Sequence, residues 1–292
     1  GMGRTIMPPK IYISLPQYEG DFRAMPSYAV NAAGVKWVNV HLNNRAKNLP
    51  TVMAVYIYSD PATGFPIAIM DGTLITSYRT GAAAAIASKY LARSESSTLG
   101  LAGCGVQAYT QLMAISKVFQ LEEVKIYDIS SRAIDKFAER NRNFNISKAS
   151  LKTAVASDIV STTTPVRSPI VKRAWIRKGT HINAIGADAP GKEELDPNIL
   201  LDARVVVDDY EQALHSGEIN VPVSKKIFTR KNIYASLGEI IAGLKKGREG
   251  KEITVFDSTG LAIQDVVTAK AVYEAARKEK IGFEIDLIGE SI

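Results

Sequence analysis

Short apolar runs alternate with helical patterns along the chain from about residue 98 onward. Thr98–Ala102 predicts a buried strand, and a helical pattern follows over Val106–Phe119. Val124–Tyr127 predicts the next strand, and the helix through Ile134–Arg140 follows it. Further strands are predicted at Asp158–Thr162, His181–Ile185, Arg204–Val207 and Ile253–Phe256. This alternation is typical of βαβ units, so we expect a Rossmann-type, doubly wound parallel sheet of the α/β class.

The first 90 residues follow a different pattern, with an alanine-rich helix over Thr80–Arg93 and little helix before it. Strands are predicted at Lys10–Leu15, Val35–Val40, Thr51–Tyr58 and Ile67–Asp71. They indicate a separate antiparallel or mixed sheet. A helix over Ala262–Lys278 and a terminal strand around Phe283–Ile288 are expected to return to that sheet. We therefore predict two domains, one formed by residues 1–91 with 264–292 and one formed by residues 92–263.

Composition and charge are typical of a globular protein and argue against a membrane-spanning, secreted or nucleic-acid-binding protein. The 292 residues are 46% hydrophobic and 23% charged, which is ordinary for a globular chain. No run reaches the roughly 18 apolar residues of a membrane helix, no signal peptide is evident, and the single cysteine, Cys104, fits a reducing cytoplasm. The net charge of +6 is spread over short basic groups without interleaved aromatic residues. This pattern favours a solvated surface and small anionic ligands over nucleic acid.

A glycine-rich turn carries the clearest local motif. Gly103-Cys104-Gly105-Val106-Gln107-Ala108 follows a predicted strand and opens a predicted helix. It matches the dinucleotide fingerprint, in which one glycine makes the tight turn and the next lets the backbone approach a pyrophosphate. Asp128 ends the second strand, 25 residues after Gly103, where a carboxylate accepts both ribose hydroxyls of NAD and repels a 2′-phosphate. The alternative is a structural turn with a helix-capping aspartate, and nearby Arg132 could weaken the preference for NAD.

The other chemically active side chains are less specific. Cys104 has no histidine near it in sequence, so a small packing residue is the favoured interpretation. The histidines, His41, His181 and His215, have no ligand spacing, and we expect no metal. Arg23, Lys36, Arg79 and Asp188 stand in apolar or glycine-rich contexts. From periodicity alone each is more readily explained as structural than as catalytic.

Segments from residue 7 to residue 270 resemble the ornithine cyclodeaminase/mu-crystallin family, and within it the archaeal alanine dehydrogenase branch. The motifs are Met7-Pro8-Pro9-Lys10, Gly34-Val35-Lys36-Trp37-Val38-Asn39, Leu49-Pro50-Thr51-Val52-Met53-Ala54, Thr63-Gly64-Phe65-Pro66, Arg79-Thr80-Gly81-Ala82, Gly103–Ala108, His181–Asp188, Val205–Asp209, Gly217-Glu218-Ile219 and Phe256–Asp265. Relatives carry a helical segment before the first of these motifs. The resemblance therefore implies that part of the substrate domain is absent from this chain.

The resemblance implies that residues 92–263 form an NAD-binding Rossmann domain. It implies that residues 1–91 with 264–292 form a substrate-binding and dimerisation domain, so that the protein is a homodimer, and it also implies specific residue roles. Lys36 matches the catalytic lysine that contacts the substrate, and Asp188 matches the catalytic aspartate beside the nicotinamide. Arg79 matches the arginine that holds the substrate carboxylate near the cofactor phosphates. Arg23 replaces the glutamate that receives the second amine in ornithine cyclodeaminases. Residues expected to bind the cofactor are Arg79, Thr80, Gly103, Gly105, Val106, Gln107, Asp128, Ile129, Ser130, Thr163, Gly186, Ala187, Asp188 and Ser258.

These roles agree with the chemistry of a 2-amino acid, whose carboxylate Arg23, Lys36 and Arg79 can bind. Asp188 can orient a water molecule, with Lys36 as its acid/base partner. For that role the Lys36 pKa would need to be lowered by burial and by Arg79. We therefore expect NAD-dependent oxidative deamination of L-alanine or a similar small L-amino acid to a 2-oxo acid. The alternatives are ornithine cyclodeamination, reduction of a cyclic imine acid such as pyrroline-2-carboxylate, and non-enzymatic binding as in mu-crystallin. Arg23 argues against the first of these, and Asp188 against the last.

Overall fold

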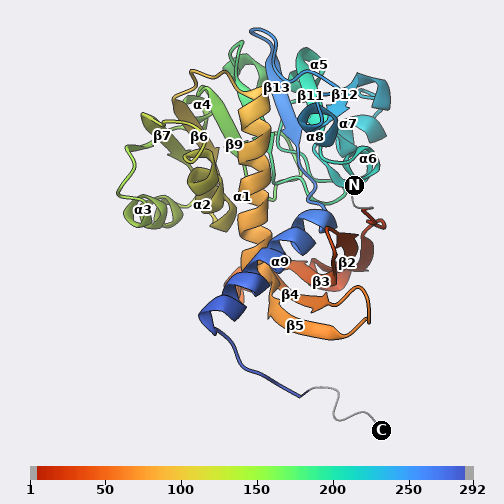
Figure 1. The fold of residues 1–292 in the computed structure, drawn as a ribbon. Coiled ribbons are helices and arrows are strands. Elements are labelled where there is room, and N and C mark those ends of the chain that lie inside the picture. The colour runs from red at the N-terminus through yellow and green to blue at the C-terminus, as the bar shows by residue number, and fades with distance from the viewer. Residues whose placement is uncertain (1–4, 287–292) are drawn as a thin grey trace. The chain divides into compact units, whose positions relative to one another are not determined.

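The structure is a computed structural model that describes residues 5–286. It divides into two compact units: unit 1 comprises Gly1–Thr76 and Ala262–Ile292, and unit 2 comprises Ser77–Leu261 (Figure 1). The division after Thr76 differs from the predicted boundary at residue 91 because helix α1 (Gly72–Leu91) begins in unit 1 and ends in unit 2. Its first turn is tied to unit 1 through Thr73 Oγ1, which accepts from the Ala54 amide, and its last turns pack in the core of unit 2.

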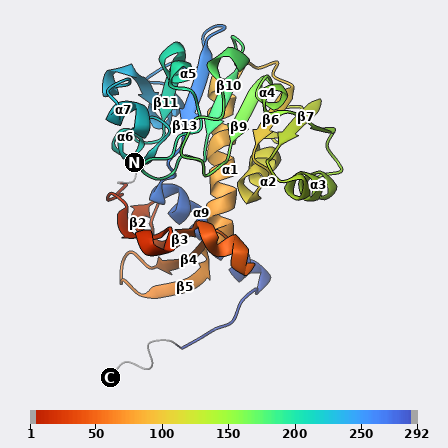
Figure 2. The same ribbon diagram turned by 180° about the vertical axis from the view of Figure 1, so that it is seen from behind.

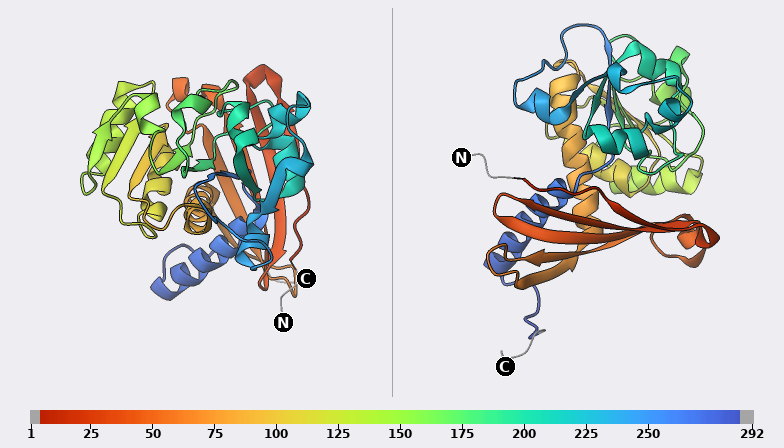
Figure 3. Two further views of the ribbon diagram at one scale, coloured as in Figure 1. Left: turned by 90° about the horizontal axis from the view of Figure 1, so that it is seen from above. Right: turned by 90° about the vertical axis from the view of Figure 1, so that its right-hand side faces the viewer.

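Unit 1 is an antiparallel sheet in the order β1-β2-β3-β4-β5, with one long helix packed on it. Its elements are β1 (Ile11–Leu15), β2 (Gly20–Ala29), β3 (Ala32–His41), β4 (Val52–Ser59), β5 (Pro66–Asp71) and α9 (Ala262–Glu279). Figure 3 shows α9 along one face of the sheet. Lys36, Val38 and Val40 alternate with exposed Trp37 along β3, so the buried face is the one that α9 covers.

Two sequence expectations fail in unit 1. The strand β2 was not predicted, because Pro26 and charged residues interrupt its apolar pattern and its hairpin turn, Val30-Asn31, has no glycine. The terminal strand expected around Phe283–Ile288 is not present over residues 283–286, and residues 287–288 lie outside the described part of the chain.

Unit 2 contains a parallel sheet in the order β12-β11-β13-β10-β9-β6-β7-β8, most of which is visible in Figure 2. The strands are β6 (Thr98–Ala102), β7 (Glu123–Tyr127), β8 (Ile146–Lys148), β9 (Ile159–Thr162), β10 (His181–Ala184), β11 (Ala203–Val207), β12 (Ile233–Ser236) and β13 (Ile253–Asp257). The helices are α2 (Val106–Ile115), α3 (Ser131–Arg140), α4 (Leu151–Ala154), α5 (Pro197–Asp202), α6 (Tyr210–Ser216), α7 (Asn220–Ser224) and α8 (Leu237–Ile241). Adjacent strands pair in parallel throughout this sheet.

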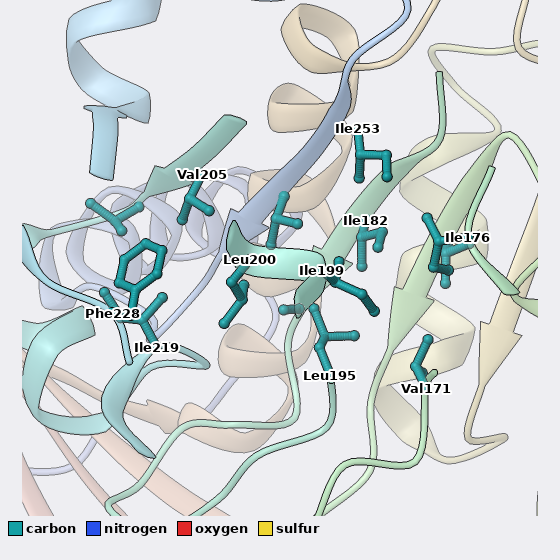
Figure 4. Close-up of a cluster of buried hydrophobic side chains, with 14 of the residues drawn as sticks. Val171, Ile176, Ile182, Leu195, Ile199, Leu200, Val205, Ile219, Phe228 and Ile253 are labelled. Atoms are coloured by element: carbon teal, nitrogen blue, oxygen red, sulfur yellow. The ribbon is translucent and has the colours of Figure 1, made fainter. Parts of the chain in front are cut away.

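Helices cover both faces of this sheet. Val205 and Val207 point into the cluster formed with α5, α6 and α7, part of which Figure 4 shows around Leu195, Ile199 and Phe228. Val206 points the other way, into the cluster with α1 and α8. Because a central strand buries both faces, its sequence is apolar without alternation. The expected α/β fold with a doubly wound parallel sheet and a separate second sheet is confirmed.

The unpredicted strands of unit 2 are the outermost ones. β8 is three residues long, and β12 follows basic residues that gave no strand pattern. Within residues 5–286, no helix is both long and apolar enough to span a membrane.

Candidate functional site

The predicted cofactor residues of unit 2 lie directly after the carboxyl ends of parallel strands. Gly103 follows β6, Asp128 follows β7, Thr163 follows β9 and Ser258 follows β13. Backbone bonds join these loops in series: Gly103 N donates to Tyr127 O, Thr163 N to Ala102 O, Gly186 N to Thr162 O and Ser258 N to Ala184 O, at 2.8–3.2 Å. The residues therefore share the edge where doubly wound sheets bind ligands.

The two glycines of the fingerprint have different surroundings. Gly103 has φ +103°, and a Cβ on it would lie 2.7 Å from Thr163 Oγ1. Gly105 is the N-cap of α2 without a side-chain cap, and a Cβ there would meet no atom within 4 Å. No side chain of the described residues caps the first-turn amides of α2, and Val106, its first residue, is 63% exposed. Uncapped amides and the helix dipole favour an anion at this position.

Asp128 connects the glycine turn with the next helix. Its Oδ2 accepts from the Cys104 amide at 2.9 Å, and its Oδ1 accepts from the Ser130 amide at 2.8 Å. Each carboxylate oxygen retains a second lone pair for a ribose hydroxyl. Ser130 caps α3 by accepting from Ala133 N, and Ile129 between them is 94% exposed. Ser130 is therefore the N-cap of α3, whereas Asp128 holds the glycine turn and the residue before the helix, in a position compatible with ribose binding.

Two buried polar atoms support the fit of a dinucleotide at this edge. Gln107 Oε1 and Ser258 Oγ are buried and have no hydrogen-bond partner among the described residues. Unsatisfied buried polar atoms are rare in native structures and call for a ligand or water partner. With the open space at Gly105, they show that the residues present suit a dinucleotide.

The loop after β10 carries Gly186, Ala187 and Asp188. A Cβ on Gly186 would lie 2.1 Å from Thr164 O, so only glycine fits there. Lys192 Nζ donates to Asp188 Oδ1 at 2.5 Å, and its side chain is only 7% exposed. A buried ammonium beside the carboxylate favours the ionised aspartate.

Buried carboxylates accept hydrogen bonds from these loops and hold them in place. The sequence analysis assigned no role to these carboxylates. Glu194 accepts from Thr162 Oγ1, Thr164 N, Thr164 Oγ1 and Gly186 N. Glu218 accepts from the amides of Glu194 and Leu195. Burial raises the pKa of Glu194 and of Glu218, and Glu194 raises that of Glu218 further.

Asp257 and Asp208 continue this set of buried carboxylates. Asp257 accepts from the amides of Glu218 and Ile219, and Asp208 accepts from the amides of Thr259 and Gly260. Burial raises the pKa of Asp257 to about 8. Their sequence signals were the family motifs Val205–Asp209 and Phe256–Asp265 and the polar residues at the end of each strand.

Arg79 and Thr80 lie on α1 in unit 2. Gly260 has φ +78°, and a Cβ on it would lie 2.5 Å from Arg79 Nη1. This glycine therefore makes room for the guanidinium, which is 8% exposed and lies against the loop that carries Ser258. The Thr80 carbonyl accepts from Gln111 on α2.

Arg23 and Lys36 lie in unit 1, on one face of its sheet. Arg23 pairs with Val38 and Met25 with Lys36, so the two cations are diagonal neighbours on adjacent strands. Arg23 is 4% exposed and donates to Asp21 through Nε at 2.7 Å and Nη2 at 3.0 Å.

Lys36 Nζ lies 2.7 Å from Asp265 Oδ2. A carboxylate at this distance favours the charged amine, which opposes the lowered pKa that the sequence analysis required of Lys36.

The cysteine and histidine side chains have structural surroundings. Burial, together with the nearby Asp128 carboxylate, raises the pKa of the Cys104 thiol to about 12. His181 is buried between Thr254 Oγ1 and Asn183 Oδ1, and burial lowers its pKa to about 3. Among residues 5–286, no group of three or more His, Cys, Asp or Glu side chains is arranged to hold a metal ion.

Comparisons with known proteins agree with this arrangement. The alanine dehydrogenase of Archaeoglobus fulgidus is 54% identical over 287 residues, covering 97% of this chain and 88% of that protein. A solved structure of an archaeal alanine dehydrogenase dimer with bound NAD has a TM-score of 0.94 and 53% identity, covering 97% of this chain and 89% of that one. The structure of the Δ1-pyrroline-2-carboxylate reductase of Thermococcus litoralis, solved with NADH and L-proline, has a TM-score of 0.93 and 41% identity. The match covers 96% of this chain and 90% of that one.

The ornithine cyclodeaminase/mu-crystallin family matches residues 1–280, nearly the whole chain. The sequence resemblance is thereby confirmed, and the chain belongs to the ornithine cyclodeaminase/mu-crystallin family.

Proposed function

We propose that this chain is an NAD-dependent dehydrogenase that converts L-alanine or a similar small L-amino acid reversibly to its 2-oxo acid. The balanced reaction consumes the amino acid, NAD⁺ and water, and yields the 2-oxo acid, ammonium, NADH and a proton. The observation that carries the proposal is the pair of buried cations, Arg23 and Lys36, on one sheet face. Guanidinium and ammonium groups suit the carboxylate of an amino acid and disfavour the second amine of ornithine.

The residues have separate roles in this proposal. The residues at the carboxyl edge of the parallel sheet in unit 2 would hold NAD⁺, which would supply the hydride acceptor for Cα. Arg79 and Lys36 hold the substrate carboxylate, and Arg23 restricts the side chain. Asp188, kept ionised by Lys192, takes the proton from the water that attacks the imine carbon.

The preference for NAD over NADP is proposed from Asp128. Its carboxylate, fixed by two backbone amides, would repel a 2′-phosphate. Asp128→Ala should weaken NADH binding by about 1.5–3 kcal/mol, the range for a hydrogen bond to a charged group, and should improve NADPH binding. Fluorescence titration with both cofactors measures this, with exposed Asp135→Asn on α3 as the control. Equal affinities of the wild-type chain for the two cofactors would contradict the assignment.

We propose a homodimer in the cytoplasm, with unit 1 as the substrate-binding and dimerisation domain. Exposed apolar side chains on the sheet face away from α9 support a second copy of the chain as the partner. The single buried cysteine is compatible with a reducing compartment.

Reduction of a cyclic imine acid is the second candidate. The similarity to the pyrroline-2-carboxylate reductase favours it, because the same cations would bind the carboxylate of either substrate. NADH formation with a panel of L-amino acids, including alanine and proline, together with ammonia release from ornithine, separates the candidates, because cyclodeamination regenerates NAD⁺ and gives no net NADH. Alanine turnover supports the proposal, proline turnover supports the reductase, and ornithine turnover supports the cyclodeaminase. NADH binding without any turnover would favour a mu-crystallin-like binding role.

Variants separate binding from proton transfer. Asp188→Asn should lower kcat by roughly 10²–10⁴-fold while NAD binding survives, because general acid–base groups contribute about that much. Lys36→Ala should lower kcat/KM without loss of NAD binding, because it removes a group that holds the substrate carboxylate. Arg79→Ala should mainly raise KM. Lys89→Ala, an exposed change on α1, is the matched control. Full activity of Asp188→Asn would remove the aspartate from the mechanism.

A further inference from the structure

Lys36 is buried against a counter-charge from another element. It lies in β3, and Asp265 lies in the first turn of α9. Their side chains are 1% and 0% exposed, with Nζ and Oδ2 2.7 Å apart. Isolated charges are very costly to bury, so each charge of this pair compensates for the burial of the other.

The other titratable groups on this face do not replace Asp265. The groups that face Lys36 from the packed strands are Asp21, Arg23, Tyr56 and Tyr58. Asp21 is engaged with the guanidinium of Arg23. Burial raises the pKa of both phenols, and the Asp265 carboxylate raises that of Tyr56 further, so both stay neutral. Asp265 is therefore the carboxylate that balances Lys36.

Anchoring of α9 does not account for this ion pair. Ser27 Oγ donates to Ala262 O at 2.8 Å at the start of the helix. Val266 and Ala269 pack with Tyr56 in the core of unit 1. Buried ion pairs are often no more stabilising than apolar residues of the same volume, so a helix that only needed anchoring would not require this pair.

We propose that Asp265 is a positioning residue that keeps Lys36 as an ammonium ion and fixes its direction, which rests on the function proposed above. Lys36 then holds the substrate carboxylate as a donor and a charge, and it removes no proton. The proton of the attacking water goes to Asp188, the ionised carboxylate of unit 2. This division of labour replaces the low-pKa lysine expected from the sequence.

The charge state of Lys36 can be measured without turnover. In the full chain with ¹³C-labelled lysine, NMR titration follows the Lys36 resonance, which is assigned by its loss in Lys36→Met. An opposite charge nearby shifts a pKa by about 1–3 units, so the Lys36 midpoint should fall by that amount in Asp265→Asn. Glu274→Gln, an exposed change on the same helix, should leave it unchanged. Equal midpoints in wild type and Asp265→Asn overturn the proposal.

Kinetics test the consequence for the reaction. The high-pH limb of the kcat/KM profile should move to lower pH in Asp265→Asn, and kcat should fall about 10²-fold through lost positioning. Asp265→Glu should return the high-pH limb of the kcat/KM profile to its wild-type position and restore part of kcat. A uniform loss of active protein without a shifted limb overturns the proposal. If the wild-type chain turns over no amino acid, the proposed function fails, while the NMR titration still decides the role of Asp265.

The proposal can still be tested if the Asp265→Asn variant fails to fold. If Asp265→Asn does not fold, the double variant Lys36→Met with Asp265→Leu, which removes both charges, should restore folding. Recovery supports a charge-balancing aspartate, and failure to recover overturns it.

Discussion

Gly103 and Gly105 belong to the same turn but require glycine for different reasons. Gly103 has a left-handed backbone and Thr163 Oγ1 in the place of a Cβ. Gly105 has an ordinary φ of −83° and open space in that direction. One glycine is needed by the fold, whereas the other is needed only if a ligand approaches.

This contrast gives a matched pair of variants. Gly103→Ala should lower the free energy of unfolding by about 1–3 kcal/mol, the cost of a strained backbone residue. Gly105→Ala should leave stability within about 0.5 kcal/mol and weaken NADH binding at least about tenfold, because a methyl group would occupy the pyrophosphate position. Denaturant unfolding and NADH titration measure the two effects. Unchanged NADH affinity in Gly105→Ala would contradict a pyrophosphate at this turn.

At the same scale, the sequence located some site residues and missed others for a physical reason. Gly103 and Gly105 belong to one contiguous motif, and Asp128 is found from its position at the end of the next predicted strand. Glu194 and Asp265 act through contacts with segments distant in sequence, and a lone acid in a helix or loop resembles a surface residue. No rule based on sequence spacing predicts the contact between Lys36 and Asp265.

Among the elements, strands buried on both faces were predicted almost to the residue because their apolar runs are continuous, as in β6 and β13. The hairpin from β2 to β3 was missed because its turn residues, Val30 and Asn31, both have φ +54°. Such a turn favours asparagine or glycine, and a β-branched residue is unusual there.

Val30 therefore offers a test of the hairpin. The left-handed conformation costs an ordinary residue about 1–2 kcal/mol, and Val30 is 64% exposed, so it loses little packing when replaced. Val30→Asn should stabilise the chain by about 1 kcal/mol in denaturant unfolding. Val30→Thr, which keeps the β-branch, should not. Equal effects of the two variants would contradict a left-handed Val30.

The loops after β11 and β13 should make stability depend on pH. Asp257 has a pKa of about 8 in the folded chain against an ordinary 3.8, so between these values the folded state binds a proton that the unfolded state releases. Stability therefore falls as pH rises through this window, by up to ~1.4 kcal/mol per pH unit. His181, with a pKa of about 3 against 6.5, acts in the opposite direction below pH 6.5.

Between pH 6.5 and 8 His181 is neutral in both states, so the difference between wild type and an Asp257 variant in this range reports the proton on Asp257. Asp257→Asn should flatten the decline in stability there, measured by denaturant unfolding without cofactor. The variant also loses one acceptor for the amides of Glu218 and Ile219, which lowers stability by an offset that does not change with pH. Curves that run parallel for wild type and variant would contradict a protonated Asp257.

At the scale of the whole molecule, unit 1 exposes a group of apolar side chains that a monomer would leave in contact with water. Trp37, Val55, Ile57 and Ile69 are 37–62% exposed, and their registers place them on one face of the antiparallel sheet. Phe22 stacks on Trp37 with ring centroids 5.3 Å apart. Contiguous exposed apolar patches are rare on monomers and mark interaction surfaces.

We expect this face to join two copies of the chain. Light scattering at several concentrations should give a dimer for the wild-type chain. Val55→Glu should raise the dissociation constant at least about 10²-fold, because an unpaired buried charge costs about 3 kcal/mol or more. Leu244→Glu, which changes a 75% exposed side chain of unit 2, should leave the dimer intact. Circular dichroism of both variants separates lost assembly from lost folding, because a folded Val55→Glu monomer places the interface on this sheet. A wild-type monomer at every concentration, or a folded Val55→Glu dimer as tight as wild type, would move the partner surface elsewhere or remove it.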